Sequence, residues 1–252
     1  MIKKKYNLIL LLFLLPSCLY AQEARNNIDF EAEEKKQHEE ENAYRFSVDY
    51  RIEIGYTQPW QHSRTDSYRN LYLHGAKVGA TFDFNLPYHL SIQTGLYYSA
   101  SYGISEQHIR AVSSEPALPQ ILKHRILSHQ LIVPVRATYT QKIWRQLALW
   151  LYTGPELSVG IAQKDYLETS LSEPTLQWCQ NQGMHTAPYE IYSARELNRT
   201  NIQWGLGGGL QWDKYRLLAG YNFGLNNLAR QQITLKQHMW EWSWYVSFSY
   251  RF

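Results

Sequence analysis

The sequence predicts an all-β protein: an eight-stranded antiparallel up-and-down transmembrane β-barrel with a short N-terminal periplasmic arm. Residues 239 to 252 alternate between large apolar side chains at even positions and mostly polar ones between, the pattern of a strand with lipid on one side. After residue 21 no window holds the eighteen apolar residues that a helical span needs. Helices and closed barrels are the two structures that satisfy the backbone in lipid, so a barrel remains.

The N-terminus predicts export. Residues 1 to 21 form a signal peptide, with lysines at positions 3 to 5, an apolar core at positions 8 to 15 and a cleavage site after Ala21. The alternative is a lipoprotein signal, which would leave Cys18 acylated.

Cleavage balances the charge. The formal charge of +3 comes from the three signal-peptide lysines, so the mature chain has no excess of basic residues. Its charge therefore gives no reason to expect nucleic-acid binding. Residues 22 to 43 are acidic and have almost no apolar face, which favours a solvated periplasmic arm over a partner-docking helix. Cys179 is then the remaining cysteine, so no internal disulfide is expected.

The barrel is expected over residues 44 to 252. Each predicted strand is long enough for a tilted crossing of about 9 to 11 residues. The strands are expected at residues 44 to 57, 70 to 84, 88 to 103, 129 to 141, 147 to 161, 201 to 213, 215 to 226 and 239 to 252.

The connections alternate between short and long. The short turns are expected at 85 to 88, 142 to 146 and 213 to 214, and the long loops at 58 to 69, 104 to 128, 162 to 200 and 227 to 238. Short periplasmic turns and long outer loops are typical of these barrels, which would put both termini of the barrel in the periplasm of a bacterial outer membrane.

The two faces of the strands differ in charge. One phase is uncharged and suits lipid: in the strand at 44 to 57 it holds Tyr50, Ile52 and Ile54. The opposite phase contains ten charges, five of each sign: Asp49, Arg51, Glu53, Lys77, Asp83, Arg136, Glu156, Arg216, Glu241 and Arg251. Because eight strands leave an interior that side chains can fill, we expect an ion-paired plug rather than an open pore.

Glycines also face inward. They are Gly205, Gly207, Gly209, Gly220 and Gly224. We expect them to make room for long Arg and Tyr side chains from the opposite wall or to ease strand curvature, with a small-ligand cavity as the alternative.

Four segments carry a family resemblance. They are the LIVPVRATY run at 131 to 139, LYTGPEL at 151 to 157, GLGGG at 205 to 209 and YNFGLNNL at 221 to 228. This part of the chain resembles the PorT-like family of bacterial outer-membrane β-barrel proteins. The resemblance implies an eight-stranded barrel without catalytic residues, and its name-giving member is associated with protein secretion. Pro134 fits such a strand as an inward-facing break in the ladder.

Catalytic, cofactor and metal sites are not expected. His74 is predicted on the lipid face, where no serine and acid can be paired with it. His108, His124 and His129 have spacings that match no compact metal motif.

We therefore expect a non-enzymatic, monomeric barrel embedded in outer-membrane lipid. Its first expected role is a structural or binding component of the cell envelope, acting through the loops 104 to 128 and 162 to 200. The alternatives are an accessory to protein secretion or envelope assembly, with envelope or secretion proteins as partners, and a lipid-modifying enzyme.

Overall fold

The computed structural model describes residues 47–63, 71–108, 121–169, 172–181, 186–194, 197–230 and 238–252. The expected signal peptide at 1 to 21, with its alternative at Cys18, and the acidic arm at 22 to 43 lie outside these residues.

Eight long strands and one short helix make up the described fold. The strands are β1 (Ser47–Ser63), β3 (His74–Asn85), β4 (Leu90–His108), β5 (Ile121–Trp144), β6 (Leu147–Leu167), β8 (Thr200–Trp212), β9 (Tyr215–Gly224) and β10 (Met239–Arg251). The two-residue strands β2 (Leu71–Tyr72) and β7 (Tyr189–Glu190) pair with β1 and β6, and helix α3 spans Glu173–Asn181.

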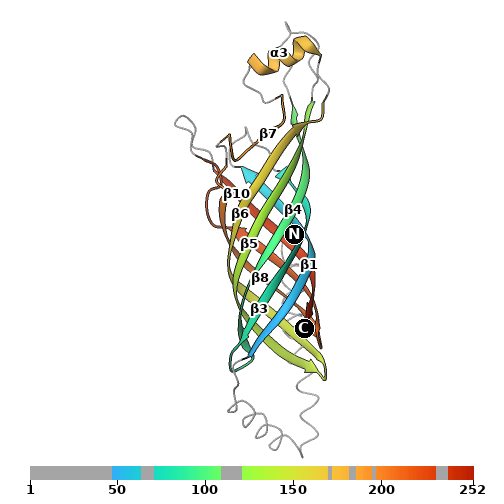
Figure 1. Ribbon diagram of the computed structural model, residues 1–252, viewed down its shortest axis with the longest axis vertical. Helices are drawn as coiled ribbons and strands as arrows, with labels where there is room; N and C mark the ends of the chain where they lie inside the picture. Colours follow the sequence, from blue (N-terminus) through green and yellow to red (C-terminus); the bar gives the residue numbers. More distant parts are fainter. Residues whose placement is uncertain are drawn as a thin grey trace, which may run out of the picture. The chain divides into compact units, whose positions relative to one another are not determined.

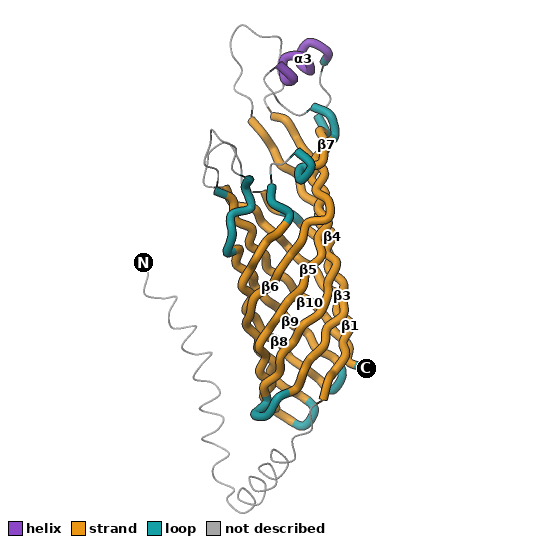
Figure 2. The backbone as a smooth tube through the Cα atoms, turned by 60° about the vertical axis from the view of Figure 1, so that its left-hand side comes forward, coloured by secondary structure: helices purple, strands orange, loops and turns teal. Residues whose placement is uncertain are grey.

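The sheet closes on itself. Neighbours along the chain pair antiparallel in the order β10-β9-β8-β6-β5-β4-β3-β1, and β1 also pairs with β10 from Arg51↔Arg251 to Ser63↔Met239. The tilted strands therefore wind around a barrel without an open edge (Figure 1). This is the predicted eight-stranded antiparallel architecture. The short turns, among them the one that joins β3 to β4, gather at one end of the barrel, the lower end in Figure 2.

The strand ends differ from prediction mostly at the long-loop side, and at the short-turn side β5 runs on to Trp144, so the turn expected at 142 to 146 is shorter than predicted. The expected loops at 104 to 128 and 162 to 200 are partly wrong, because β4 continues to His108, β5 starts at Ile121 and β6 continues to Leu167. The loop at 58 to 69 likewise begins later, since β1 runs to Ser63. The extra residues stay paired across β4, β5 and β6. Polar composition had marked them as loop, but inter-strand pairing overrides that signal.

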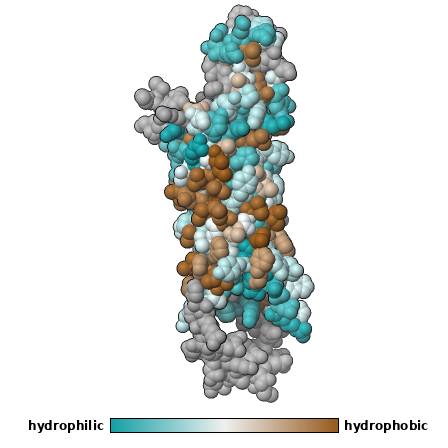
Figure 3. Space-filling view, viewed as in Figure 1, coloured by the Kyte–Doolittle hydropathy of each residue, from teal (hydrophilic) through white to brown (hydrophobic). Residues whose placement is uncertain are grey.

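The barrel turns its apolar side chains outward. The exposed large residues include Ile52, Leu96, Val135, Leu206 and Phe248, all in the predicted lipid-facing phase. On the face that Figure 3 shows, hydrophobic residues gather over the middle of the barrel, with hydrophilic residues above and below them. None of the helices in the described ranges has the length and apolar content needed to span a bilayer.

Pro134 interrupts two ladders, as predicted. It is buried on the inner face. The pairing of β5 with β4 omits residues 133–134, and the pairing with β6 keeps Pro134↔Glu156 but omits residues 135–136. Its carbonyl oxygen accepts a hydrogen bond of 2.9 Å from Thr94 Oγ1. On the neighbouring strand Gly154 has φ +156° and approaches the carbonyl oxygen of Val135 so closely that a Cβ would lie 2.2 Å from it. Glycine is therefore required beside the break in the ladders.

The two faces of β8 allow a direct test. Leu206 is 47% exposed on the outside, whereas Gln203 is 3% exposed inside, beside the Glu241 carboxylate. Leu206→Arg should cost about 2 to 4 kcal/mol near the middle of the bilayer, because it puts a charge in lipid. Gln203→Arg should cost less, because its charge meets polar groups. Urea unfolding of both variants in lipid vesicles measures the difference, and equal losses would contradict the assigned faces.

Candidate functional site

The lumen holds the predicted charges. Eight of the ten are buried: Arg51, Glu53, Lys77, Asp83, Arg136, Glu156, Arg216 and Glu241. The other two, Asp49 and Arg251, lie partly exposed near the short-turn end, where Arg251 Nη1 is 3.3 Å from Asp49 Oδ2. The ten charges come from β1, β3, β5, β6, β9 and β10, where alternation turns every second side chain inward.

A first group of charges lies toward the short turns, and we call it the turn-end cluster. Arg51 Nε and Arg216 Nη2 donate to the same oxygen of Asp83, at 3.0 and 3.2 Å. Gln93 donates to the second oxygen of Asp83 at 2.6 Å, and Gln211 accepts from both arginines. Two cations share one carboxylate, so this end of the lumen carries excess positive charge.

The central cluster contains two balanced ion pairs. Arg136 Nη2 lies 2.9 Å from Glu156 Oε2, and Lys77 Nζ lies 2.9 Å from Glu53 Oε1. Tyr97 donates to Glu53 at 2.8 Å. Each pair links two neighbouring strands of the wall, β5 with β6 through Arg136 and Glu156, and β3 with β1 through Lys77 and Glu53. Removing one member of such a buried pair leaves an uncompensated charge.

Aromatic side chains fill the space around these charges, and the sequence reasoning missed them as a group. Trp150, Tyr152, Leu218 and Tyr245 form a buried cluster, and the Tyr152 and Tyr245 hydroxyl oxygens are 2.5 Å apart. The Arg136 guanidinium lies 4.5 Å from the centre of the Tyr152 ring. Such contacts between a cation and a ring add attraction when water is excluded.

The inward glycines make room for a tyrosine, as expected, but Tyr152 lies on β6, the strand next to β8, and not on the opposite wall. A Cβ on Gly220 would lie 2.0 Å from the Tyr152 hydroxyl oxygen, and one on Gly207 would lie 2.5 Å from its ring. The sequence held a signal for this packing: Tyr152 is on the inward phase of its strand, and the strands that follow are rich in inward glycines.

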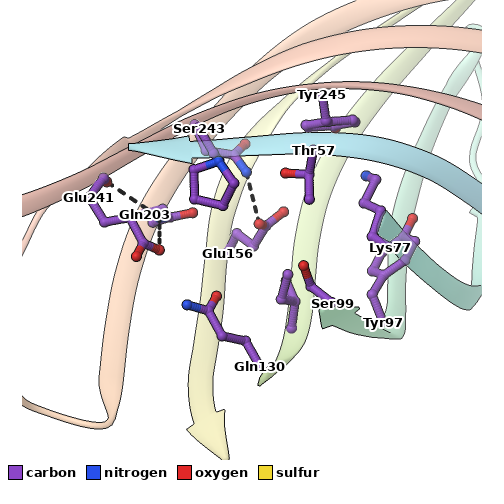
Figure 4. Close-up of a pocket in the computed structure, with 13 residues that line it drawn as sticks. Thr57, Lys77, Tyr97, Ser99, Gln130, Glu156, Gln203, Glu241, Ser243 and Tyr245 are labelled. Carbon is purple, nitrogen blue, oxygen red and sulfur yellow. Dashed lines mark hydrogen bonds between the residues drawn. The ribbon is translucent and has the colours of Figure 1, made fainter. Parts of the chain in front are cut away.

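Glu241 differs from the other buried carboxylates. Its side chain accepts hydrogen bonds from Gln61 at 2.9 Å and Asn201 at 3.2 Å, with Gln203 at 3.4 Å. It lines a cavity of about 20 Å³ that Lys77 and Glu156 also line. Glu241 and Gln203 lie at one end of this cavity and Lys77 with Tyr97 at the other (Figure 4).

A small apolar cluster lies at the long-loop end, and we call it the outer cap. Its buried residues are Ile191, Tyr192, Leu197, Leu228, Ala229 and Met239. Backbone hydrogen bonds of 2.8 Å from Asn198 to Leu228 and from Leu228 to Met239 tie it together. Tyr192, Leu197 and Leu228 share a cavity of about 10 Å³ with Glu241, so the cap lies against the outer end of the lumen.

One cap neighbour, Glu190, is a tightly held carboxylate outside the membrane-spanning strands. Desolvation raises the pKa of the Glu190 carboxyl, but hydrogen bonds from Ser193 and from the backbone N–H of Gln163 outweigh it, so the pKa lies below its ordinary value.

The histidines are kept apart. His74 is exposed on the outside, where Nδ1 lies 2.6 Å from the Tyr56 hydroxyl oxygen. His129 makes a similar contact of 2.7 Å with Tyr98, while His124 pairs with Asp165 at 3.0 Å. The side chain of His108 lies outside the described ones. In the described part of the chain, no three His, Cys, Asp or Glu residues form a group suited to a metal ion.

The chain belongs to the family described as Outer membrane protein beta-barrel domain, whose model matches residues 20–230. The chain is therefore an outer-membrane β-barrel protein of bacteria. The match does not extend to the narrower PorT-like group.

Solved structures with similar topology include Neisserial surface protein A, with 10% identity over 82% of this chain and 99% of that chain and a TM-score of 0.42. The attachment invasion locus protein Ail of Yersinia pestis, in complex with the heparin analogue sucrose octasulfate, has 14% identity over the same shares and a TM-score of 0.36. With TM-scores below 0.5, these similarities carry no argument about the site. A search of curated proteins found no match.

The Arg136–Glu156 pair gives the second prediction. Arg136→Met should destabilise the barrel by about 3 to 5 kcal/mol if the site is dry, because Glu156 loses its cation. Adding Glu156→Gln should recover part of that loss, because the uncompensated charge is removed. Urea unfolding of the two single variants and the double variant measures the coupling.

Additive losses would show that the pair does not interact. The filled lumen also predicts no steady open conductance for the wild-type protein in planar bilayers, and a stable ion-selective channel would contradict the plug.

Proposed function

We propose that this chain is a non-enzymatic, non-conducting outer-membrane barrel that binds a partner protein or surface ligand through a projecting part of its sheet. The projection consists of residues 103–108 of β4, 121–128 of β5 and 162–167 of β6. Its position beyond the other strands is the observation that carries the proposal (Figure 2).

Strand length supports the projection. About 9 to 11 residues are enough for a tilted strand to cross the bilayer, yet β5 has 24 residues and β6 has 21. The pairing of β6 with β8 ends at Val159↔Thr200, so the last eight residues of β6 rise beyond β8. At about 3.3 Å per residue this adds roughly 26 Å of strand.

The projection is built as a stable surface. Ion pairs brace its outer side, where Lys123 lies 3.3 Å from Glu106 and Arg125 contacts Glu168. On the inner side Ile126 packs with Leu71 and Leu73 in a buried cluster. Between these supports Ile104 stays 54% exposed. A rigid strand pair with exposed apolar and charged side chains suits recognition of another surface, because little order is lost on binding.

The interior favours binding over transport or catalysis. Ion pairs and aromatic rings occupy the middle of the lumen, and the outer cap lies against its outer end. The barrel is then a scaffold that holds the projection outside the cell. We infer that both ends of the barrel then lie on the periplasmic side. Residues 1 to 21 would be removed on export, and the acidic residues 22 to 43 would lie in the periplasm.

An accessory role in secretion is the second candidate. It is favoured by the resemblance of the Pro134 strand and its Gly154-Pro155 neighbour to PorT-like proteins, and the structure places these features side by side on β5 and β6. Such a role would place the main contacts at the periplasmic end or on the arm.

Labelling of single cysteines tests the orientation. Residue 173 in α3 and residue 214 in the short turn after β8 lie at opposite ends of the barrel. In a Cys179→Ser background, Glu173→Cys should react with a membrane-impermeant maleimide on intact cells. Lys214→Cys should react after the outer membrane is permeabilised. The reverse pattern would invert the barrel.

Photo-crosslinking tests the binding surface. A crosslinking amino acid at Ile104 should form adducts with protein or with a surface polymer in intact cells, whereas the same amino acid at Leu96, on the same face of β4, should label lipid. A third variant at Tyr88, in the short turn before β4, reports on the periplasmic end. Adducts confined to position 88 would support the secretion role and overturn the proposed one.

A matched deletion separates surface binding from folding. Gly103 and Ile126 pair directly across the β4–β5 hairpin, so residues 104 to 125 can be replaced by a two-residue Asn-Gly turn that suits this geometry. With the crosslinking amino acid moved to Lys164 of β6, which the deletion keeps, the full-length barrel should form adducts, whereas the shortened barrel should fold and form none. Unchanged crosslinking elsewhere on the outer face would place the binding surface outside the projection.

A further inference from the structure

Glu241 is a buried carboxylate without a positive partner. It is 3% exposed, and no Lys, Arg or His in the described part of the chain forms an ion pair with it. Each of the other three buried lumen carboxylates forms an ion pair with a lysine or an arginine; they are Glu53, Asp83 and Glu156. Burying a charge without a partner is costly, so this position needs an explanation.

The groups around Glu241 are neutral and rich in oxygen. Gln61, Asn201 and Gln203 surround the carboxylate, and Gln130 lines the two cavities that Glu241 also lines. Asn201 is 4% exposed, lines the cavity below the outer cap and leaves its Oδ1 without a hydrogen bond among the described residues. A half-turn of a side-chain amide exchanges its NH2 for its oxygen, so these residues can face a cation as well as a carboxylate.

The cavities provide the space. The inner one, of about 20 Å³, has room for a water-sized group and is also lined by the hydroxyl residues Thr57 and Ser243. The outer one, of about 10 Å³, brings Asn201 and Asn198 to the same carboxylate. Oxygen atoms of carboxylates, amides, hydroxyls and water are the ligands that hard cations take.

We propose that Glu241, with Asn201, Gln61 and Gln130, forms a buried binding site for a small monovalent cation such as Na⁺. One carboxylate neutralises one positive charge, so a monovalent ion leaves the site neutral, whereas a divalent ion would leave a buried excess of +1.

The nearby cations do not replace this ion. Lys77 lines the same inner cavity, but its ammonium group lies 2.9 Å from Glu53 and 3.3 Å from the centre of the Tyr245 ring. Arg199 lines the outer cavity, but it is exposed and turned to the Ile161 carbonyl and Glu190. Both are committed elsewhere.

Ion-dependent stability tests the proposal. Urea unfolding of the wild-type barrel in detergent micelles is compared at fixed pH and ionic strength, with choline chloride exchanged for NaCl. Once the site is saturated, a tenfold rise in Na⁺ should lower the apparent unfolding constant by about tenfold. Glu241→Gln keeps the shape and removes the charge, so it should lose this dependence and equal or exceed the wild type in choline chloride.

Two further measurements complete the test. Glu168→Gln removes a carboxylate from an exposed ion pair of the projection, so this control should keep the full Na⁺ dependence. Crystals of the wild-type protein soaked in thallium(I) should show an anomalous peak in contact with the Glu241 carboxylate. Equal wild-type stability in choline and sodium salts, or no peak at Glu241, would overturn the proposal in favour of a protonated carboxyl. These readouts do not depend on the outer projection.

Discussion

Closure of the sheet between β1 and β10 is the constraint on which the rest of this structure depends. The two strands pair continuously from Arg51↔Arg251 to Ser63↔Met239, although one opens the barrel and the other ends it. In lipid an unpaired strand edge would leave its backbone groups without hydrogen bonds, so an open sheet of the same strands could not cross the membrane. Closure also decides which side of each strand is enclosed.

A closed ring of eight strands leaves a narrow interior, and that interior explains the ion pairs. The inward side chains cannot reach bulk water, so charges persist there when they find partners on other strands, as Arg136 does with Glu156. Aromatic rings fill the remaining space where glycines on β8 and β9 permit, with Tyr152 lying against Gly220. Polar packing therefore does inside this barrel what apolar packing does in a soluble domain.

The same constraint separates the scaffold from the surface that we propose for binding. The outside of the membrane-spanning part faces lipid and the inside is filled, so in the proposed function the parts of strands beyond the bilayer make the contacts. The projection of β4, β5 and β6 continues the hydrogen-bond ladder of the wall, which gives a binding surface rigidity that a free loop lacks. Glu241 lies below the outer cap and shares a small cavity with Tyr192 of the cap.

The alternation of the sequence determined much of this fold. Strand order, the outward phase of residues such as Leu206 and the inward phase of Arg136 follow from a period of two, because a side chain's face depends on its position within its own strand. The break at Pro134 and the role of the inward glycines were also readable. Strand ends were not, since polar residues such as Lys123 and Lys164 remain in strands when neighbouring strands extend with them.

Tertiary structure alone decided which inward groups meet. Contacts across the lumen depend on the register and stagger of all eight strands, and no local pattern encodes these. The ten charges were equal in number by sign, yet the structure gives Asp83 two arginines and surrounds Glu241 with amides. Composition determined the total charge of the lumen by itself. The closed geometry determined where that charge is balanced, because electrostatic pairing acts over a few ångströms between strands distant in sequence.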